Sequence, residues 1–461
     1  MICRPGAWQQ DCAARLTFDR ATKGPNGEDP RKIVTADEGE YLMSVVWSPD
    51  SRRIAYERFA FGPEGARASI ESRDLKGSHL VIAVSDPKLA GGFGGFCWLA
   101  DGRLIYSLGG GASSYGFPDA NLWEVKADAA GQPNVRPTRI TTWAGFSLAG
   151  TNASAGGKRL VFGRVNVQTD VYVGDLEPGG TRLKTPPRRL TLDERNDLPT
   201  GWTPDSKAVL FQSDRSGNQD IYKQALDQDS AEPFVATTPQ AKRGPRLSAD
   251  GHWIIYLSYQ KPPEEMTTSD PVELMRVPVS GGPSHLVLTG HGLFVDERCA
   301  RAPATLCLLR EDDRRQLIFT AYDPVGGRGR EVTRIANQPG LGIGNWGLSP
   351  DGSQIAMLFP EGENRIRLFP VAGGAPRELV VNGWYGFCSG PDWFPDGKGF
   401  YVGSSSPRGA TLLYIDLNGS TRPMWEQKGS LQTWGVPSPD GRHLAILGLT
   451  VDSNVWMLEN F

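Results

Sequence analysis

Short apolar runs recur along the chain, and each follows directly on a turn-forming sequence. They occupy residues 53–56, 104–106, 209–211, 254–256, 355–357, 400–402 and 444–446. Nearly continuous apolar runs of this length are typical of strands that are buried on both faces. After a polar loop come runs in which apolar and polar residues alternate, at residues 121–123, 170–172, 220–222, 412–414 and 454–456. No segment has a sustained helical period, so the pattern predicts an all-β chain.

A turn motif precedes each apolar run. In the best-preserved copies an aromatic residue or leucine is followed by Ser-Pro-Asp or Thr-Pro-Asp, as in Trp47 to Asp50 and Trp202 to Asp205. Proline sets φ for the turn, the aspartate accepts hydrogen bonds from backbone N–H groups, and a following glycine takes the left-handed conformation. With the aspartate or its equivalent as marker, the copies lie at positions 50, 101, 156, 205, 250, 304, 351, 396 and 440. The copies at 156 and 304 are eroded.

The markers are 44 to 55 residues apart, a spacing typical of the blades of a β-propeller. Each repeat reads as strand, turn, strand, loop, strand, turn and outer strand, the last at residues 281–286 and 373–379 for example. The sequence therefore predicts an all-β fold, a β-propeller of four-stranded blades. Nine markers favour eight or nine blades. An eight-bladed ring with one irregular insertion, or two unequal propellers, are the alternatives.

The two ends of the repeat region predict how the ring closes. The ninth repeat ends after residues 454–458 without an outer strand, whereas residues 29–34 resemble an outer strand without a blade. Pairing them would hide two sheet edges. We therefore expect the N-terminal strand to close the last blade, with one propeller over residues 29–461 and an unplaced N-terminal segment over residues 1–28.

Composition excludes several classes of protein. The 461 residues include 56 Gly and 35 Pro and carry a formal net charge of −3, which suits many tight turns and gives no reason to expect a nucleic-acid partner. Residues 1–18 contain no apolar run of the kind found in signal peptides. No stretch of about 18 apolar residues could span a bilayer. From the chain as written we expect no membrane insertion, and a cytoplasmic location if the chain is complete.

The six cysteines are too few for a disulfide scaffold in a chain of this length. Cys299 and Cys307 are close enough in sequence to form a disulfide bond in an oxidising compartment. Buried free thiols in strands are the alternative for both residues.

The repeated motif resembles the WD40-like Pro-Asp (PD40) repeats of TolB-type propellers over roughly residues 29 to 461. The stretch from Trp202 to Tyr222 shows this best, since it contains both the marker turn and a Ser-Asp-Arg-Ser-Gly-Asn hairpin. Residues 438–461 are similar to the C-terminal propellers of some bacterial, acidobacterial-type serine/threonine kinases and winged-helix regulators. That resemblance implies a sensor or interaction module in the periplasm or another extracytoplasmic compartment, fused to or paired with a kinase or winged-helix effector. This chain itself has no kinase loops and no winged helix.

Related repeats also form the propeller of prolyl-oligopeptidase-like peptidases, so catalytic and metal-binding motifs bear on the function of this chain. A hydrolase elbow needs Gly-x-Ser-x-Gly, and the sequences around Ser113 and Ser147 do not have this spacing. The five histidines lie too far apart for a zinc motif. The oxygen-rich hairpin at residues 214–220 lacks the bidentate glutamate of a calcium loop. We therefore expect no enzyme activity, no metal site and no cofactor.

Tryptophan is the one residue type whose placement suggests a ligand site. Most of the 13 tryptophans fall at marker or strand positions, where packing between blades accounts for them. Four precede a marker turn instead, and with one tyrosine they are the candidate ligand contacts: Trp143, Trp346, Trp384, Tyr385 and Trp434. Inner strands line the channel of a propeller, so these side chains would face a ligand there. A core role is the alternative for each of them.

The sequence thus favours a non-catalytic propeller that binds a protein partner or small ligand, as the sensory part of a bacterial envelope signalling system. A peptidase propeller that lacks its hydrolase domain is one alternative. A TolB-like scaffold that bridges envelope proteins is the other.

Overall fold

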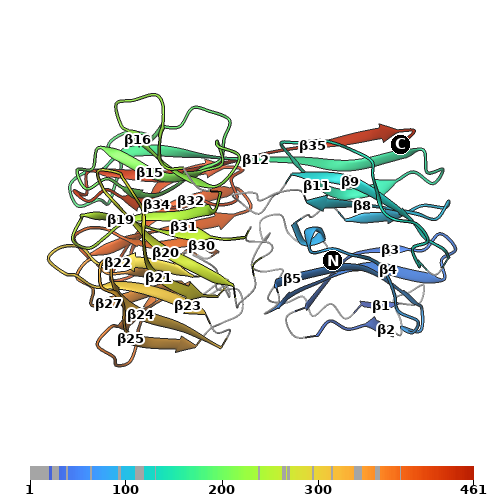
Figure 1. Ribbon diagram of the computed structural model, residues 1–461, viewed down its shortest axis with the longest axis horizontal. Coiled ribbons are helices and arrows are strands. Elements are labelled where there is room, and N and C mark those ends of the chain that lie inside the picture. The colour runs from blue at the N-terminus through green and yellow to red at the C-terminus, as the bar shows by residue number, and fades with distance from the viewer. Residues whose placement is uncertain are drawn as a thin grey trace. The chain divides into compact units, whose positions relative to one another are not determined.

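The computed structural model describes residues 20–22, 31–37, 40–62, 65–91, 95–109, 119–129, 131–236, 239–261, 266, 270–292, 295–312, 315–336, 345–358, 364–384 and 386–461. Within these residues the chain forms strands β1 to β35 and a short 3₁₀ helix, η1 (Pro87–Gly91) (Figure 1). The contacts divide the chain into two compact units. Unit 1 includes residues 168–261 and 269–450, and unit 2 includes residues 15–167 and 451–461.

Unit 1 consists of four-stranded antiparallel sheets, five of which are formed by four consecutive strands. From inner to outer strand these are β14 (Asp197–Trp202), β15 (Ala208–Ser213), β16 (Asp220–Ala225), β17 (Glu232–Val235); β18 (Ala241–Leu247), β19 (Trp253–Tyr259), β20 (Pro271–Pro278), β21 (His285–His291); β22 (Asp296–Cys299), β23 (Cys307–Asp312), β24 (Gln316–Asp323), β25 (Gly327–Ala336); β26 (Trp346–Leu348), β27 (Gln354–Leu358), β28 (Arg365–Pro370), β29 (Arg377–Val380); and β30 (Phe387–Trp393), β31 (Gly399–Ser406), β32 (Gly409–Asp416), β33 (Thr421–Lys428).

The sixth sheet of unit 1 combines strands from two distant parts of the chain. Its strand order is β34 (Gly435–Pro437), β35 (His443–Glu459), β12 (Arg159–Asp175) and β13 (Arg188–Arg189), and unit 1 contains residues 443–450 of β35 and residues 168–175 of β12. The inner strands β34, β14, β18, β22, β26 and β30 contact one another in this order, and β30 contacts β34. Unit 1 is therefore a closed β-propeller of six blades, with apolar clusters buried between successive sheets.

The strand that closes the ring differs from the predicted one. Within residues 29–34, the structure forms β2 (Arg31–Val34), which pairs with β1 (Arg20–Thr22) rather than with the last repeat. Residues 168–175 close the ring instead, and the backbone N–H of Leu176 donates to the Arg442 carbonyl at 2.8 Å. This closure hides the edges of the first and last strands of unit 1, which is the physical requirement that the prediction identified.

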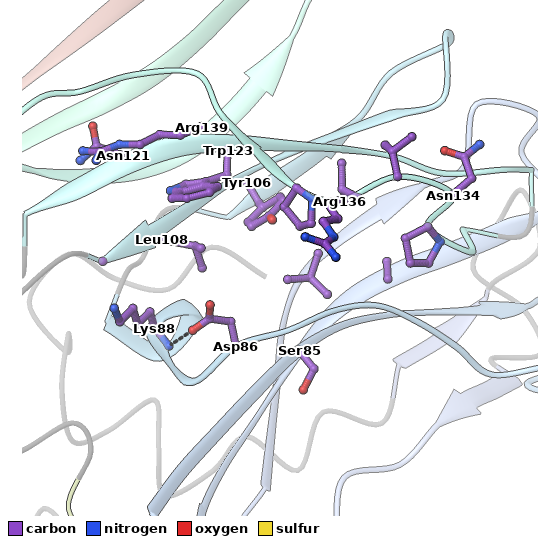
Figure 2. A pocket seen from close by; sticks show the side chains of 17 residues that line it. Ser85, Asp86, Lys88, Tyr106, Leu108, Asn121, Trp123, Asn134, Arg136 and Arg139 are labelled. Atoms are coloured by element: carbon purple, nitrogen blue, oxygen red, sulfur yellow. Dashed lines mark hydrogen bonds between the residues drawn. The ribbon is translucent and has the colours of Figure 1, made fainter.

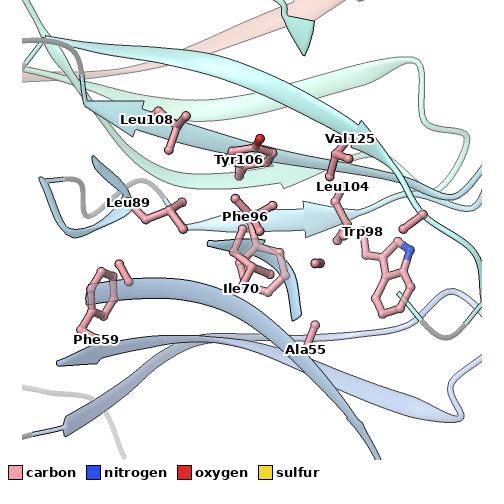
Figure 3. Packing of buried hydrophobic residues seen from close by; sticks show 14 residues of the cluster. Ala55, Phe59, Ile70, Leu89, Phe96, Trp98, Leu104, Tyr106, Leu108 and Val125 are labelled. Carbon is pink, nitrogen blue, oxygen red and sulfur yellow. The ribbon is translucent and has the colours of Figure 1, made fainter. Parts of the chain in front are cut away.

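Unit 2 contains the first three repeats. Its sheets are β3 (Glu40–Trp47), β4 (Arg53–Gly62), β5 (Gly65–Asp74), β6 (Val81–Ser85); β7 (Phe96–Trp98), β8 (Arg103–Gly109), β9 (Ala120–Lys126), β10 (Thr138–Arg139); and β11 (Ser147–Ala153) with the first half of β12 and the second half of β35. The inner strands β3, β7 and β11 are neighbours in this order. Phe59, Ile70, Phe96, Leu104 and Tyr106 are among the buried residues that pack the first two sheets together (Figure 3). The repeats expected to form one propeller over residues 29–461 are thus divided, three in unit 2 and six in unit 1.

The predicted turn chemistry is confirmed at the markers, all nine of which lie between the first and second strand of a repeat. In the fourth repeat, Asp205 Oδ1 accepts hydrogen bonds from Thr203 Oγ1 at 2.7 Å and from the Lys207 backbone N–H at 3.1 Å. The next residue, Ser206, takes a φ of 61°, and glycine takes the same left-handed conformation in the repeats that contain it. The side chain at the start of the turn and the aspartate therefore fix the entry into the second strand.

No helix in the described part of the chain has the length and apolar character needed to cross a membrane.

Candidate functional site

The strongest candidate site in unit 1 is a cavity of about 360 Å³ at the centre of the six-bladed ring. All six inner strands contribute to it through an equivalent position, the residue before the last one in each strand. These penultimate residues are Gly201, Arg246, Arg298, Gly347, Asp392 and Val436. The strand register makes these six positions equivalent, because each penultimate residue pairs with the second or third residue of the next strand. Gly201, for example, pairs with Leu210, and Asp392 pairs with Tyr401.

Two of the penultimate residues are glycines because the inner strands approach one another closely there. A Cβ on Gly201 would lie 2.5 Å from the carbonyl oxygen of Pro245 in the next blade. A Cβ on Gly347 would overlap the carbonyl oxygen of Pro391 in the same way. Backbone therefore fills these two sectors of the ring. The polar character of the cavity comes from the other sectors.

Positive charge exceeds negative charge among the residues that line this cavity. Arg246, Arg298 and Arg301 are the basic lining residues, whereas Asp250 and Asp392 are the acidic ones, of which Asp392 is at a penultimate position. Arg246 Nη1 lies 3.5 Å from Asp392 Oδ1, across the ring between blades three apart. Arg301 Nη1 donates to the Pro439 carbonyl at 3.3 Å, so this side chain reaches from the β22 blade to the marker turn of the last repeat.

Burial and neighbouring charges shift the pKa values of the three arginines in different directions. Burial lowers the pKa of Arg246, and the neighbouring Arg298 lowers it further, although Asp392 and Asp296 offset part of the effect. Burial also lowers the pKa of Arg301, to about 10, with only Asp392 opposing it. Arg298 differs because Asp296, Asp392 and Glu297 more than offset its burial and raise its pKa. The charges on Arg246 and Arg301 are thus incompletely compensated by the protein.

Two carboxyl groups on β22 interact with the arginines of the cavity. Asp296 Oδ1 accepts from Arg298 Nη1 at 2.7 Å, and Asp296 Oδ2 accepts from Trp346 Nε1 at 3.0 Å. Burial raises the pKa of Asp296, but Arg298, Arg246 and Arg310 outweigh burial and hold that pKa below its usual value.

The neighbouring carboxyl, Glu297, behaves in the opposite way. Burial raises the pKa of Glu297 to about 7, because Arg246 and Arg298 offset the burial only in part. Its Oε2 accepts from the Tyr322 hydroxyl at 2.8 Å. Near neutral pH this residue therefore supplies only part of a negative charge, which adds to the positive excess of the site.

The structure does not bring together the four predicted ligand contacts that lie among the described residues. Trp346 is fully buried, and Trp384 and Trp434 are half-buried against different apolar clusters of unit 1. Trp143 belongs to unit 2 and packs against Phe146 and Phe162, with ring centroids 5.5 and 5.4 Å apart. Tyr385 lies outside the described residues. None of the four described tryptophans is among the residues that line the central cavity.

The arginines of the site were not singled out from the sequence, although a positional signal exists. Arg246 and Asp392 directly precede the Leu or Trp that begins a marker motif, as Gly201 and Gly347 also do. An aligned set of repeats therefore places these residues at one level of the channel. In the fifth and eighth repeats that position is charged, which is unusual for a site surrounded by apolar strands.

The structure joins Cys299 and Cys307 by a disulfide bond, and Cys299 lines the cavity. The two residues face each other across the pairing of β22 with β23, so the bond closes the hairpin that contains Arg298 and Arg301. The Cys299 sulfur also lies 3.4 Å from the Tyr322 hydroxyl that binds Glu297. The disulfide therefore belongs to the framework of the site.

Replacing both cysteines by serine is expected to lower the free energy of unfolding by about 2–3 kcal/mol, because a short loop is no longer closed in the unfolded state. Urea denaturation followed by far-UV circular dichroism measures the change. Dithiothreitol should reduce the stability of the native protein to the same level and leave the double variant unchanged. A native protein as stable in reductant as without it, with both thiols shown to be free, would contradict the expectation.

Among the described residues, no group of three or more His, Cys, Asp or Glu side chains is arranged to hold a metal ion.

Comparisons with known proteins give only weak structural likenesses. No protein-family model matches the sequence, and a search of the curated proteins gives no match. A crystal structure of TolB from Acinetobacter baumannii is 14% identical with a TM-score of 0.43, over 82% of this chain and 81% of that one. A putative TolB from Agrobacterium tumefaciens is 15% identical with a TM-score of 0.23, over 81% and 94% of the two chains.

A puromycin-hydrolysing peptidase of Mycobacterium tuberculosis is 13% identical with a TM-score of 0.34, and the match covers 86% of this chain and 58% of the peptidase. Likenesses this weak carry no argument about function. The assignment of unit 1 as a β-propeller rests on its own strand pairing and closed ring.

Proposed function

We propose that this chain is a non-catalytic binding propeller that takes up an anionic group of a protein or small ligand at the centre of unit 1. Its role would be that of a sensor or interaction module in a bacterial envelope signalling system. The single observation that supports the proposal is the excess of basic residues around one cavity, which is lined by the three arginines Arg246, Arg298 and Arg301 and by two aspartates, Asp250 and Asp392.

The physical argument concerns uncompensated charge. Removing a guanidinium from water is costly unless it is paired. Burial lowers the pKa of Arg246 and of Arg301, which is the direction expected where pairing within the protein is incomplete. An incoming carboxylate or phosphate would supply the missing charge and accept two parallel hydrogen bonds from one guanidinium. The closed ring of inner strands holds the three arginines in place before a ligand arrives, which lowers the entropic cost of binding.

Arg301→Ala is expected to weaken binding of an acidic probe at least about tenfold, since one charge-assisted hydrogen bond contributes about 1.5–3 kcal/mol. The probe is a tetraglutamate peptide, and isothermal titration calorimetry measures its dissociation constant. Arg442→Ala is the matched control, because Arg442 belongs to the same unit and its side chain is 80% exposed. Equal affinity of both variants for the peptide would contradict the proposal.

The nature of the partner is tested by site-specific photo-crosslinking in the source cells. A benzoylphenylalanine in place of Ala302, which lines the cavity, is expected to capture a protein that the same label at exposed Val325 does not. Mass spectrometry of the adduct then distinguishes the candidate functions. A kinase, winged-helix regulator or their regulatory partner would support the sensor role. A hydrolase chain would favour the peptidase propeller, and an envelope lipoprotein would favour the scaffold.

A further inference from the structure

A second and larger cavity lies entirely within unit 2. It has a volume of about 930 Å³ and is bordered by β6, β8 and β9 and by the segment that leads into β10. Figure 2 shows Tyr106, Leu108 and Trp123 on one side of it and Ser85, Asp86 and Lys88 on the other, with Arg136 between them. The volume falls within the range of small-molecule sites, about 300–1,000 Å³.

The wall of this cavity continues the apolar core of unit 2. Tyr106, Leu108 and Val125 belong to the buried cluster that joins the first two sheets, and Trp123 packs against that cluster while half-buried. The two sheets pack closely at their inner strands. The cavity lies between them, nearer to their outer strands. An aromatic or aliphatic ligand would therefore bury its surface against side chains that the fold already holds in place.

The polar lining of the same cavity is predominantly basic. Lys88, Arg136 and Arg139 line it, against one acidic residue, Asp86. Asp86 Oδ1 already accepts a hydrogen bond from the backbone N–H of Lys88 at 2.8 Å. The Arg139 side chain is oriented by donation from its Nε to the Thr141 carbonyl at 2.6 Å. An apolar wall beside an excess of positive charge is complementary to a ligand with an apolar body and an acidic group.

We infer that the cavity between the β3–β6 and β7–β10 sheets is a binding site for a small amphipathic organic acid. The apolar body of the ligand lies against Trp123 and its neighbours, and the acidic group pairs with Arg136 and Arg139. This site shares no residue with the central cavity of unit 1, so the inference does not depend on the proposed function.

The test uses two dyes that differ in one acidic group. The first is 8-anilinonaphthalene-1-sulfonate, and the second is N-phenyl-1-naphthylamine, which has the same rings without the sulfonate. The whole chain is titrated with each, and dye fluorescence and quenching of tryptophan fluorescence are recorded. We expect one saturable site for the sulfonate, with the neutral dye bound at least about tenfold more weakly because it cannot pair with the arginines.

Two substitutions on the exposed part of the lining distinguish what the positive charge contributes to dye binding from what the apolar wall contributes. Arg136→Glu should weaken sulfonate binding at least about tenfold and leave the neutral dye within about twofold. Val135→Asp, which adds a charge at a position 54% exposed, should weaken both dyes. Arg52→Glu and Val325→Asp are the matched controls at exposed positions away from the lining, and they should leave the binding of both dyes unchanged.

Three results would overturn the inference. One is equal affinity for the two dyes, which would show that the arginines do not select an acid. Another is sulfonate binding that neither Arg136→Glu nor Val135→Asp weakens, which would place the dye elsewhere. The third is the lack of any saturable binding of the sulfonate.

Discussion

Replacing Trp346 by alanine is expected to lower the free energy of unfolding of unit 1 by about 3–5 kcal/mol, among the largest effects of any single substitution. Trp346 is fully buried between the β22–β25 and β26–β29 blades, and its ring meets that of Phe319 edge-on with centroids 5.0 Å apart. Truncation to alanine leaves a cavity, because the close-packed side chains around it can relax only in part.

Loss of the indole also removes the hydrogen bond from Trp346 Nε1 to Asp296 and the contact with Arg298, whose guanidinium carbon lies 5.3 Å from the ring centre. Trp346→Phe keeps most of the apolar volume but not the N–H group, and should cost about 1–3 kcal/mol for the unpaired carboxylate oxygen. Because Asp296 orients Arg298, the phenylalanine variant is also expected to bind tetraglutamate more weakly than the native protein.

Urea denaturation monitored by far-UV circular dichroism tests this prediction. Trp47→Ala is the control, because Trp47 is 54% exposed and its loss should change stability by less than about 0.5 kcal/mol. We expect the two units to unfold in separate transitions, in which case the midpoint that moves in Trp346→Ala identifies the transition of unit 1. A loss below about 1 kcal/mol would mean that the site at Trp346 collapses around the smaller residue.

The strands and turns of this protein could be predicted because their determinants are local. In the Ser/Thr-x-Asp turn the hydroxyl donates to the aspartate, as Ser349 Oγ does to Asp351 Oδ1 at 2.5 Å, and the same oxygen accepts from the Ser353 backbone N–H at 3.0 Å. The apolar run after the turn is buried whichever blade it joins. These features repeat along the chain, so even eroded copies at 156 and 304 were placed between the correct strands.

The closure of the ring could not be predicted from the same features, because it depends on which partner a strand meets. In most repeats a turn folds the third strand back onto the second, as residues 214–219 do between β15 and β16. In the third and ninth repeats the chain instead runs straight on, through the 17-residue strands β12 and β35. The second half of β12 therefore joins the first half of β35 in unit 1.

The same exchange occurs in unit 2, where Asn460 donates its backbone N–H to the Lys158 carbonyl at 2.9 Å. A sequence signal for it exists, since residues 163–168 contain no Pro, Asp or Gly-Asn turn between the two halves of β12. Alternation of apolar and polar residues predicts a strand but says nothing of its partner.

The residues of the candidate site could not be predicted from the sequence for a similar reason. Tryptophan was expected at a ligand site because it is large and amphipathic, yet Trp346 and Trp434 use their indole N–H groups inside the fold, the latter on the Pro199 carbonyl at 2.8 Å. The sequence places Arg246 and Asp392 at equivalent positions of their repeats, but the strand register is what puts Arg246, Arg298 and Asp392 at one level of the ring. Residue type alone does not show which of several buried-strand positions faces a channel.

A second large effect concerns the pH dependence of stability in unit 2, where Glu57 on β4 is only 4% exposed. Burial raises the pKa of Glu57 to about 7, and a hydrogen bond from Ser44 offsets the burial only in part. Below pH 4.5, the usual value for this carboxyl, both folded and unfolded states are protonated and stability does not depend on Glu57. As pH rises toward 7 the unfolded state releases this proton first, so Glu57 makes the folded state progressively less stable.

Glu57→Gln removes this dependence, and its advantage over the native protein is expected to grow between pH 5 and pH 7 to about 3 kcal/mol and then stay constant. Urea denaturation at pH 5, 6, 7 and 8 measures the difference. Glu459→Gln, also in unit 2 but with a side chain 50% exposed, is the control and should differ from the native protein by less than about 0.5 kcal/mol at every pH. Other buried carboxyls titrate in both proteins, so only the difference between variant and native curves reports Glu57. A difference that is the same at pH 5 and pH 8 would show that Glu57 reaches solvent or a cation when it ionises.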